Sequence, residues 1–147
     1  MREILFCGNR IDNGERVEGF YHYTNWYHPV TKELAFTEHW ILPVGGQDAF
    51  QVDPETVGQY IGLKDNKRSE KYPNGQPIFE GHIVDVEYDI QYVGVAAERI
   101  GLFEVVFDDG CFMKKNKKGL FHFIPSDKCK VVGNIHDNPE LLKAVRR

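Results

Sequence analysis

The sequence has few cysteines, and the three that it has lie far apart. Cys7, Cys111 and Cys129 form no C-x-x-C pair among the 147 residues. Zinc knuckles need ligands at short spacings, and small secreted scaffolds are dense in disulfide-forming cysteines. Both classes are therefore disfavoured, and we expect reduced thiols in a cytoplasmic protein.

Long apolar stretches are missing too. No run of about 18 apolar residues occurs, although a membrane-spanning helix needs roughly that length. The first eight residues also lack the apolar segment of a signal peptide. We therefore expect neither export nor a membrane partner.

The chain has no excess of basic charge, since its formal net charge is −4. Duplex nucleic acid bound by general phosphate neutralisation requires a strong basic excess, so this mode of binding is disfavoured. No Gly-x-Ser-x-Gly is found, and the glycines at 58 and 62 are not followed by Gly-Lys-Ser/Thr. We predict a protein that is not an enzyme and that needs no cofactor.

Aromatic residues are frequent, at 13% of the chain with ten Phe and seven Tyr, and they favour strands. Asn13-Gly14 predicts a tight turn between strands at residues 3–11 and 16–23. The polar segment 24–34 predicts a connecting loop. The rest of an N-terminal β part, over about residues 1–63, consists of strands near 38–42 and 49–52, one helical turn capped by Asp53, and an extended segment at 57–63.

A charged segment at about residues 64–77 predicts a surface loop. Short strands then follow at close spacing, at residues 83–88, 92–95, 102–107, 111–113, 120–124 and 130–135. This spacing predicts a small SH3-like β-barrel over about residues 78–136. A short helix capped by Asn138 is expected over about 138–145. The fold class is therefore mainly β, in a single domain over residues 1–147.

Four stretches together resemble one family. They are Met1-Arg-Glu-Ile-Leu-Phe with Ile11-Asp-Asn-Gly-Glu, the signature Val52-Asp-Pro-Glu-Thr-Val-Gly-Gln-Tyr-Ile-Gly-Leu-Lys-Asp, Ile78-Phe-Glu-Gly-His-Ile-Val, and Val132-Gly-Asn-Ile-His-Asp-Asn-Pro-Glu-Leu-Leu. In combination they resemble the YopX family of phage and prophage proteins. The resemblance implies a β-rich fold, a phage or mobile-element origin and self-association, with no established activity and no catalytic residues.

The chain departs from the family pattern at a few positions. Cys7 stands where Arg is usual, Arg16 where an aromatic residue is common, and His82 where Asp normally follows Glu-Gly. The last departure weakens any catalytic role for an acid at that place. The loop at residues 66–76 is also longer than the family's short turn.

Asp85, Glu87 and Asp89 alternate along a predicted strand, so all three carboxylates point to one face, where they could bind a divalent cation. A metal-dependent nuclease would use such a face. The simpler interpretation is an ordinary strand with apolar residues inside and polar residues outside. We favour the simpler interpretation and predict no metal site, since the six histidines are also scattered without ligand spacing.

A cluster of lysines marks a predicted hairpin tip between aromatic residues. It consists of Lys114, Lys115, Lys117 and Lys118, with Phe112, Phe121 and Phe123 beside it. Cations next to aromatic rings can hold single-stranded nucleic acid through phosphate contacts and base stacking. Lysine is equally the residue expected in an exposed turn, where it discourages edge pairing.

A second cluster concentrates aromatic surface in the N-terminal part, at Tyr21, Tyr23, Trp26, Tyr27 and Trp40. Such residues commonly anchor protein interfaces, and packing in a small core explains them about equally well. For a self-associating protein we favour an interface.

The first functional hypothesis is a non-enzymatic phage accessory protein that forms a homo-oligomer and binds a host or phage macromolecule in the bacterial cytoplasm. One alternative is a nucleic-acid-binding module that uses the lysine-rich hairpin. A second alternative is a nuclease-type enzyme with a metal ion on the acidic face.

Overall fold

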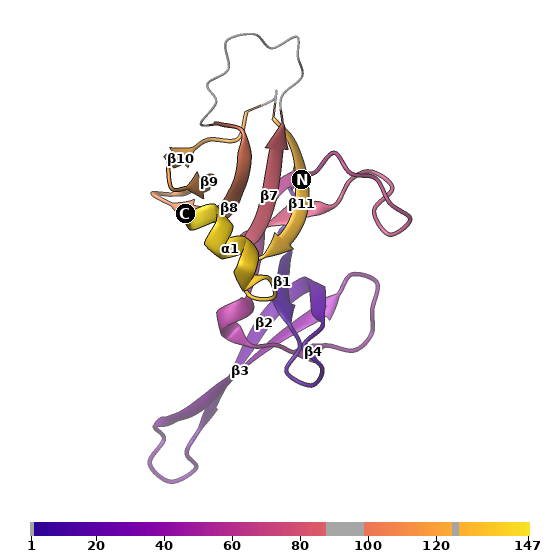
Figure 1. The fold of residues 1–147 in the computed structure, drawn as a ribbon. Helices are drawn as coiled ribbons and strands as arrows, with labels where there is room; N and C mark the ends of the chain where they lie inside the picture. Colours follow the sequence, from indigo (N-terminus) through magenta and orange to yellow (C-terminus); the bar gives the residue numbers. More distant parts are fainter. Residues whose placement is uncertain (1, 88–98, 125–126) are drawn as a thin grey trace. The chain divides into compact units, whose positions relative to one another are not determined.

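The computed structural model describes residues 2–87, 99–124 and 127–147. The chain is divided into two compact units, Met1–Tyr60 and Ile61–Arg147, whose ribbons are drawn in Figure 1. The predicted strand at 92–95 lies outside the described residues.

The first unit is an antiparallel sheet built around a hairpin. Its strands are β1 (Phe6–Asn9), β2 (Arg16–Tyr27), β3 (Leu34–Pro43), β4 (Phe50–Gln51) and the start of β5 (Gly58–Lys64), which continues into the second unit. Hydrogen bonds join the strands in the order β4-β3-β2-β1-β5. The predicted turn between β1 and β2 is confirmed, because Gly14 has φ +74° and its N–H donates to Arg10 O at 2.9 Å.

The predicted loop at residues 24–34 exists but is too long. Strand β2 runs on to Tyr27 and β3 begins at Leu34, so the connection covers only residues 28–33. Directly opposite pairs, Thr24 with Glu38 and Trp26 with Phe36, continue the ladder through this segment. Cross-strand contacts stabilise a sheet more than single-residue preferences do, and polar residues such as Asn25 hid the strand in the sequence.

The segment that follows β4 is held by backbone and capping contacts. One turn of 3₁₀ helix, η1 (Pro54–Thr56), begins where predicted, and Asp53 Oδ1 accepts a hydrogen bond from Glu55 N at 3.1 Å. The hydroxyl of Thr56 accepts from Asn9 N at 2.8 Å, which ties the turn to β1. Within the signature stretch, Asp53 and Thr56 are therefore explained by hydrogen bonds inside the first unit.

The second unit is a five-stranded antiparallel sheet with the order β10-β9-β8-β7-β11. The bounds are β6 (Pro77–Phe79), which extends the other sheet, then β7 (His82–Glu87), β8 (Gly101–Asp108), β9 (Cys111–Asn116), β10 (Gly119–Phe121), β11 (Lys128–Asn134) and the helix α1 (Pro139–Arg146). The core of this unit consists of Ile78, Val84, Val86, Phe103, Val105 and Cys129. The mainly β fold and the short C-terminal helix are confirmed.

A single buried carboxylate closes the loop at residues 66–76. Asp65 Oδ1 accepts from the backbone N–H groups of Lys67 and Gln76, at 3.1 and 2.8 Å. Asp65 Oδ2 accepts from Val131 N of β11 at 3.0 Å. The two ends of this longer loop are therefore fixed to each other and to the edge of the sheet.

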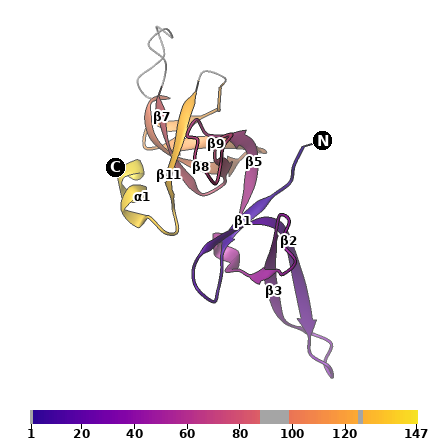
Figure 2. The ribbon, with the colours of Figure 1, turned by 90° about the vertical axis from the view of Figure 1, so that its right-hand side faces the viewer.

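Helix α1 contacts β8 and β11, and Figure 2 shows it beside β11. Val145 is buried, and Arg146 donates from Nε and Nη2 to the two carboxylate oxygens of Glu104, each at 3.3 Å. Asn138 occupies the cap position without making a side-chain capping bond. Its Oδ1 accepts from Asn134 N at 3.1 Å instead, so it stabilises the turn before the helix.

Candidate interaction surface

A two-stranded ribbon extends the β2–β3 hairpin beyond the neighbouring strands (Figure 1). The pairing of β1 with β2 ends at Phe6 opposite Gly19, and β4 pairs only with Trp40 and Ile41 of β3. We call residues 20–42 the arm. Tyr21 and Ile41 pack within the unit at the base of the arm, whereas residues 25–36 have no sheet neighbour other than each other's strand among the described residues of the first unit and are exposed.

Register divides the arm into two faces. One face, called the aromatic face, carries the opposite pairs Phe20–Leu42, His22–Trp40, Thr24–Glu38 and Trp26–Phe36. His22 stacks on Trp40 with ring centroids 6.4 Å apart, and Trp26 stacks on Phe36 at 6.2 Å. The rings thus form two stacked pairs on one face of the ribbon, with Thr24 and Glu38 between them.

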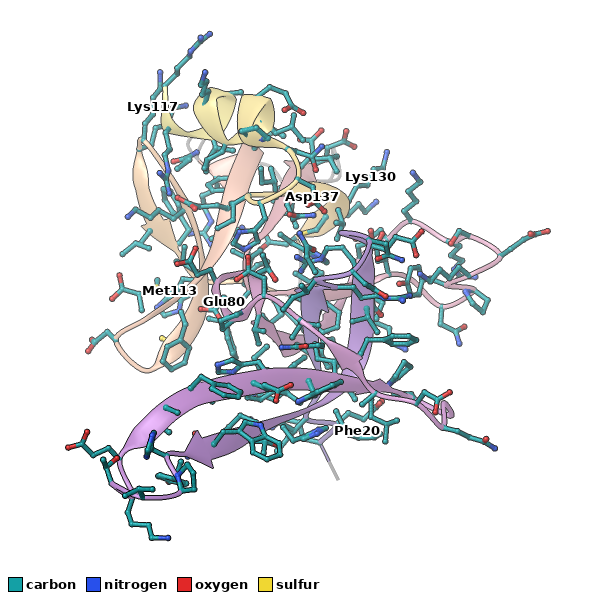
Figure 3. The ribbon with its side chains drawn as sticks, turned by 90° about the horizontal axis from the view of Figure 1, so that it is seen from below. Phe20, Glu80, Met113, Lys117, Lys130 and Asp137 are labelled. Carbon is teal, nitrogen blue, oxygen red and sulfur yellow. The ribbon has the colours of Figure 1, made fainter. Side chains whose placement is uncertain are left out.

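The aromatic face is unusually exposed for its chemistry. Phe20, Trp26 and Phe36 expose 51%, 50% and 56% of their surface, and Figure 3 labels Phe20 on the ribbon of β2. The whole arm contains only three ionised side chains, Lys32, Glu33 and Glu38. Aromatic enrichment combined with depletion of charge is typical of the core of a protein–protein interface.

The five predicted interface residues are divided by the structure. Tyr23, Trp26 and Tyr27 are exposed, whereas Tyr21 and Trp40 are half-buried. Tyr21 lies on the opposite face, 5.3 Å from the ring of Phe6, and its hydroxyl lies 2.5 Å from His39 Nδ1. Burial raises the pKa of Tyr21 above its usual value. Tyr21 therefore packs within the unit.

Sequence reasoning missed four exposed apolar residues of the arm, namely Phe20, Val30, Leu34 and Phe36. Phe36 and Leu34 were placed before the predicted strand, so no partner could be assigned to them. Leu42, Trp40 and Phe36 stand at even positions of β3, and Phe20, His22 and Trp26 stand at even positions of β2. This shared alternation was the signal that could have found the aromatic face.

The lysine-rich hairpin exists as β9 and β10, but Lys114 does not belong to its exposed tip. The side chain of Lys114 is 0% exposed, and its Nζ lies 2.6 Å from Asp127 Oδ2, between the rings of Phe103 and Phe123. Alternation along β9 turns Lys114 toward the core, opposite Val105. The inclusion of Lys114 in a nucleic-acid surface is therefore wrong.

The other three lysines of the hairpin remain at the surface. Lys115, Lys117 and Lys118 are exposed, and Figure 3 shows Lys117 at the periphery of the second unit. Lys115 lies directly opposite Glu104, whose carboxylate bonds to Arg146. The hairpin therefore presents three lysines at the surface.

The acidic strand face is paired with lysines. Asp85 lies directly opposite Lys130, and Glu87 lies opposite Lys128, across β7 and β11. Asp89 lies outside the described residues. Within the described ranges, no three His, Cys, Asp or Glu side chains gather as a metal site. Opposite charges at facing positions of neighbouring strands are favourable, which gives Asp85 and Glu87 a structural explanation.

Two of the three cysteines are buried, and none forms a disulfide in the described residues. Burial raises the pKa of Cys7 to about 11 and that of Cys129 to about 12. Both thiols stay protonated near neutral pH, which makes them poor nucleophiles.

The described residues thus define a mainly β protein with an exposed aromatic arm in its first unit. The model of one protein family, described as YopX protein, matches residues 21–143. The chain belongs to the YopX family, as the four sequence stretches indicated. Neither the comparison with curated proteins nor that with solved structures found a match. In the described part of the chain, no helix is long and apolar enough to cross a membrane.

Proposed function

We propose that this YopX-family protein is a non-enzymatic accessory protein of phage or prophage origin that self-associates and binds a host or phage macromolecule in the bacterial cytoplasm. The observation that carries the proposal is the aromatic face of the arm. We also propose that the second unit is an SH3-like barrel. The support is its set of short antiparallel strands, of which β7 to β10 pair in chain order.

Leaving the aromatic face in water is costly. Phe20, Trp26 and Phe36 each keep about half of their surface exposed. Burial of an aromatic side chain stabilises an interface by roughly 1.5–3 kcal/mol. A second copy of the chain supplies an equally apolar surface, and Glu38 is the one ionised side chain among the eight residues of the aromatic face, so association buries these rings with little desolvation of charge.

The test replaces both stacked rings at the end of the arm. We expect the variant with Trp26→Ser and Phe36→Ser to dissociate at least about tenfold more readily than the wild type, because exposed aromatic anchors dominate interface energies. Light scattering coupled to size-exclusion chromatography measures the mass, and circular dichroism checks the fold.

A matched control is Phe107→Ser in β8, where an aromatic side chain is 55% exposed in the second unit. This variant should keep the wild-type mass. A wild-type protein that stays monomeric at high concentration would contradict self-association.

A second candidate function is binding of single-stranded nucleic acid by the β9–β10 turn, favoured by the exposure of Lys115, Lys117 and Lys118. Replacing these three lysines by Glu should abolish retention of a fluorescent oligonucleotide at low salt. The control makes the same charge change at Lys64, Lys67 and Lys71. Equal loss in both variants, or no binding by the wild type, would rule out a site at the turn.

A further inference from the structure

The first observation is an unpaired edge on β2. Continuing the register of β1 would place Leu5 opposite Phe20. Residues 2–5 form no strand, however, and the carbonyl of Leu5 accepts a hydrogen bond from Tyr60 N at 2.8 Å. Among the described residues, β2 from Phe20 to Tyr27 therefore pairs on one side only, with β3.

The parity of the ladder shows which backbone groups face this edge. Arg10 N donates to Glu15 O at 2.8 Å, so the odd-numbered residues of β2 direct their backbone groups toward the β1 side. The hydrogen bond from Val52 N to His39 O, on the far side of β3, agrees with this parity. Tyr21, Tyr23 and Asn25 therefore present their N–H and C=O groups to the free edge.

This edge lacks the features by which sheets normally prevent pairing. Residues 20–27 contain no ionised side chain and no proline. The outer edge of β3, in contrast, carries Glu38 and is partly covered by β4. A register irregularity between Trp26 and Tyr27 ends the regular edge of β2. The open stretch is therefore residues 20–26.

The geometry points to a second copy of the chain as the partner of this edge, with the two β2 strands antiparallel and Tyr23 opposite Tyr23 of the second copy. This inference rests on the proposed self-association and specifies its mode. Parity allows only odd residues to face each other in hydrogen-bonded pairs, and the register centred on Tyr23 uses the whole of residues 20–26. About six backbone hydrogen bonds would form.

Side chains support the same register. It places Phe20 opposite Trp26 of the second copy, in a non-hydrogen-bonded pair, where side chains approach most closely. Phe20 also borders an open cavity of about 490 Å³ whose other lining residues are Arg2, Glu3, Ile4 and Leu5. The half-exposed indole of Trp26 has the size and apolar character to cover Phe20 and enter this cavity.

The surface involved is sufficient for a modest dimer. Phe20, Tyr23 and Trp26 lie on β2 itself and expose half or more of their surface, about 100 Å² each. Together they supply about 300 Å² of aromatic surface per partner, to which the strand backbone adds, so the contact is smaller than the roughly 800 Å² of a standard interface and fits a weak, reversible dimer. The edge is uncharged, so a two-fold arrangement brings no like charges together.

Disulfide trapping tests the register. In a Cys111→Ser background, Tyr23→Cys should form a disulfide-linked dimer for most of the chain under mild oxidation, because opposite Cα atoms lie about 5.5 Å apart. The control Thr37→Cys lies on β3, on the same face of the arm and one strand farther away. It should remain unlinked while both reduced variants keep the wild-type mass.

Charge exchange gives a second readout. Phe20→Lys and Trp26→Glu should each weaken association more than tenfold. The double variant should regain much of the loss, because the ammonium introduced at position 20 would face the carboxylate introduced at position 26 of the second copy. An oligomer in which Thr37→Cys crosslinks and Tyr23→Cys does not, without rescue by the double variant, would overturn the edge pairing and leave self-association standing. A monomeric wild type would overturn both.

Discussion

At the scale of single residues, the pair Lys114–Asp127 shows how a charge enters this core. Both side chains are almost fully buried and 2.6 Å apart, and the ammonium lies near two phenylalanine rings. A buried ion pair compensates its own desolvation only while both partners are present. The pair therefore joins β9 to the residue before β11, and it stabilises the core only while both charges are present.

Removing one partner should destabilise the second unit strongly. We expect Lys114→Met to lower the free energy of unfolding by about 3–5 kcal/mol, because Asp127 would remain as a buried, unpaired carboxylate. The double variant with Asp127→Leu should recover most of this loss. Chemical denaturation measures both, and Lys117→Met, at an exposed position, should stay within about 0.5 kcal/mol of the wild type. Equal losses in the single and double variants would show that the pairing contributes little.

At the scale of elements, the base of the arm depends on the close approach of β2 and β3. Gly19 is buried opposite Pro43, and a Cβ built there would overlap Leu42 O and lie 2.7 Å from Leu42 C. Both are backbone atoms, so no side-chain rotation can relieve the contact. The close approach of β2 and β3 at the base of the arm therefore requires glycine at position 19.

Gly19→Ala should accordingly destabilise the first unit by at least about 2 kcal/mol, because the strands must separate to admit the methyl group. Thermal unfolding followed by near-ultraviolet circular dichroism reports the loss. The matched change Gly8→Ala meets only side-chain atoms at 3.3 Å and should cost less. A Gly8→Ala variant as unstable as Gly19→Ala would argue against a backbone clash as the cause.

Elements formed by contacts between residues close in the sequence could be predicted, and those formed by distant contacts could not. The β1–β2 turn, the helical turn after Asp53 and the C-terminal helix have local signals in Asn-Gly, Asp-Pro and Asn-Pro, and the structure confirms all three. The outer part of the arm, residues 24–37, was missed because its stability comes from pairs such as Trp26 with Phe36, ten residues apart. Lys114 was misplaced because strand alternation depends on register, which a local pattern around the lysines does not reveal.

At the scale of the whole molecule, association through the arm should make stability depend on concentration. Any partner that binds the folded state alone stabilises it by mass action. Raising the protein concentration about a hundredfold should raise the melting temperature by about 5 °C. Calorimetry at several concentrations measures this shift. The variant with Trp26→Ser and Phe36→Ser should show a smaller shift, and a wild-type melting temperature independent of concentration would contradict the proposed assembly.

By itself, the sequence determined the mainly β class, the family, the local turns and the depletion of charge around a group of aromatic residues. Composition and short-range turn chemistry are sufficient for these features. Only the tertiary structure decided that Lys114 is buried, that Asp85 and Glu87 lie opposite lysines, and that Phe20, Trp26 and Phe36 share one exposed face. Each of these depends on strand register, and a shift by one residue would turn every side chain to the other face.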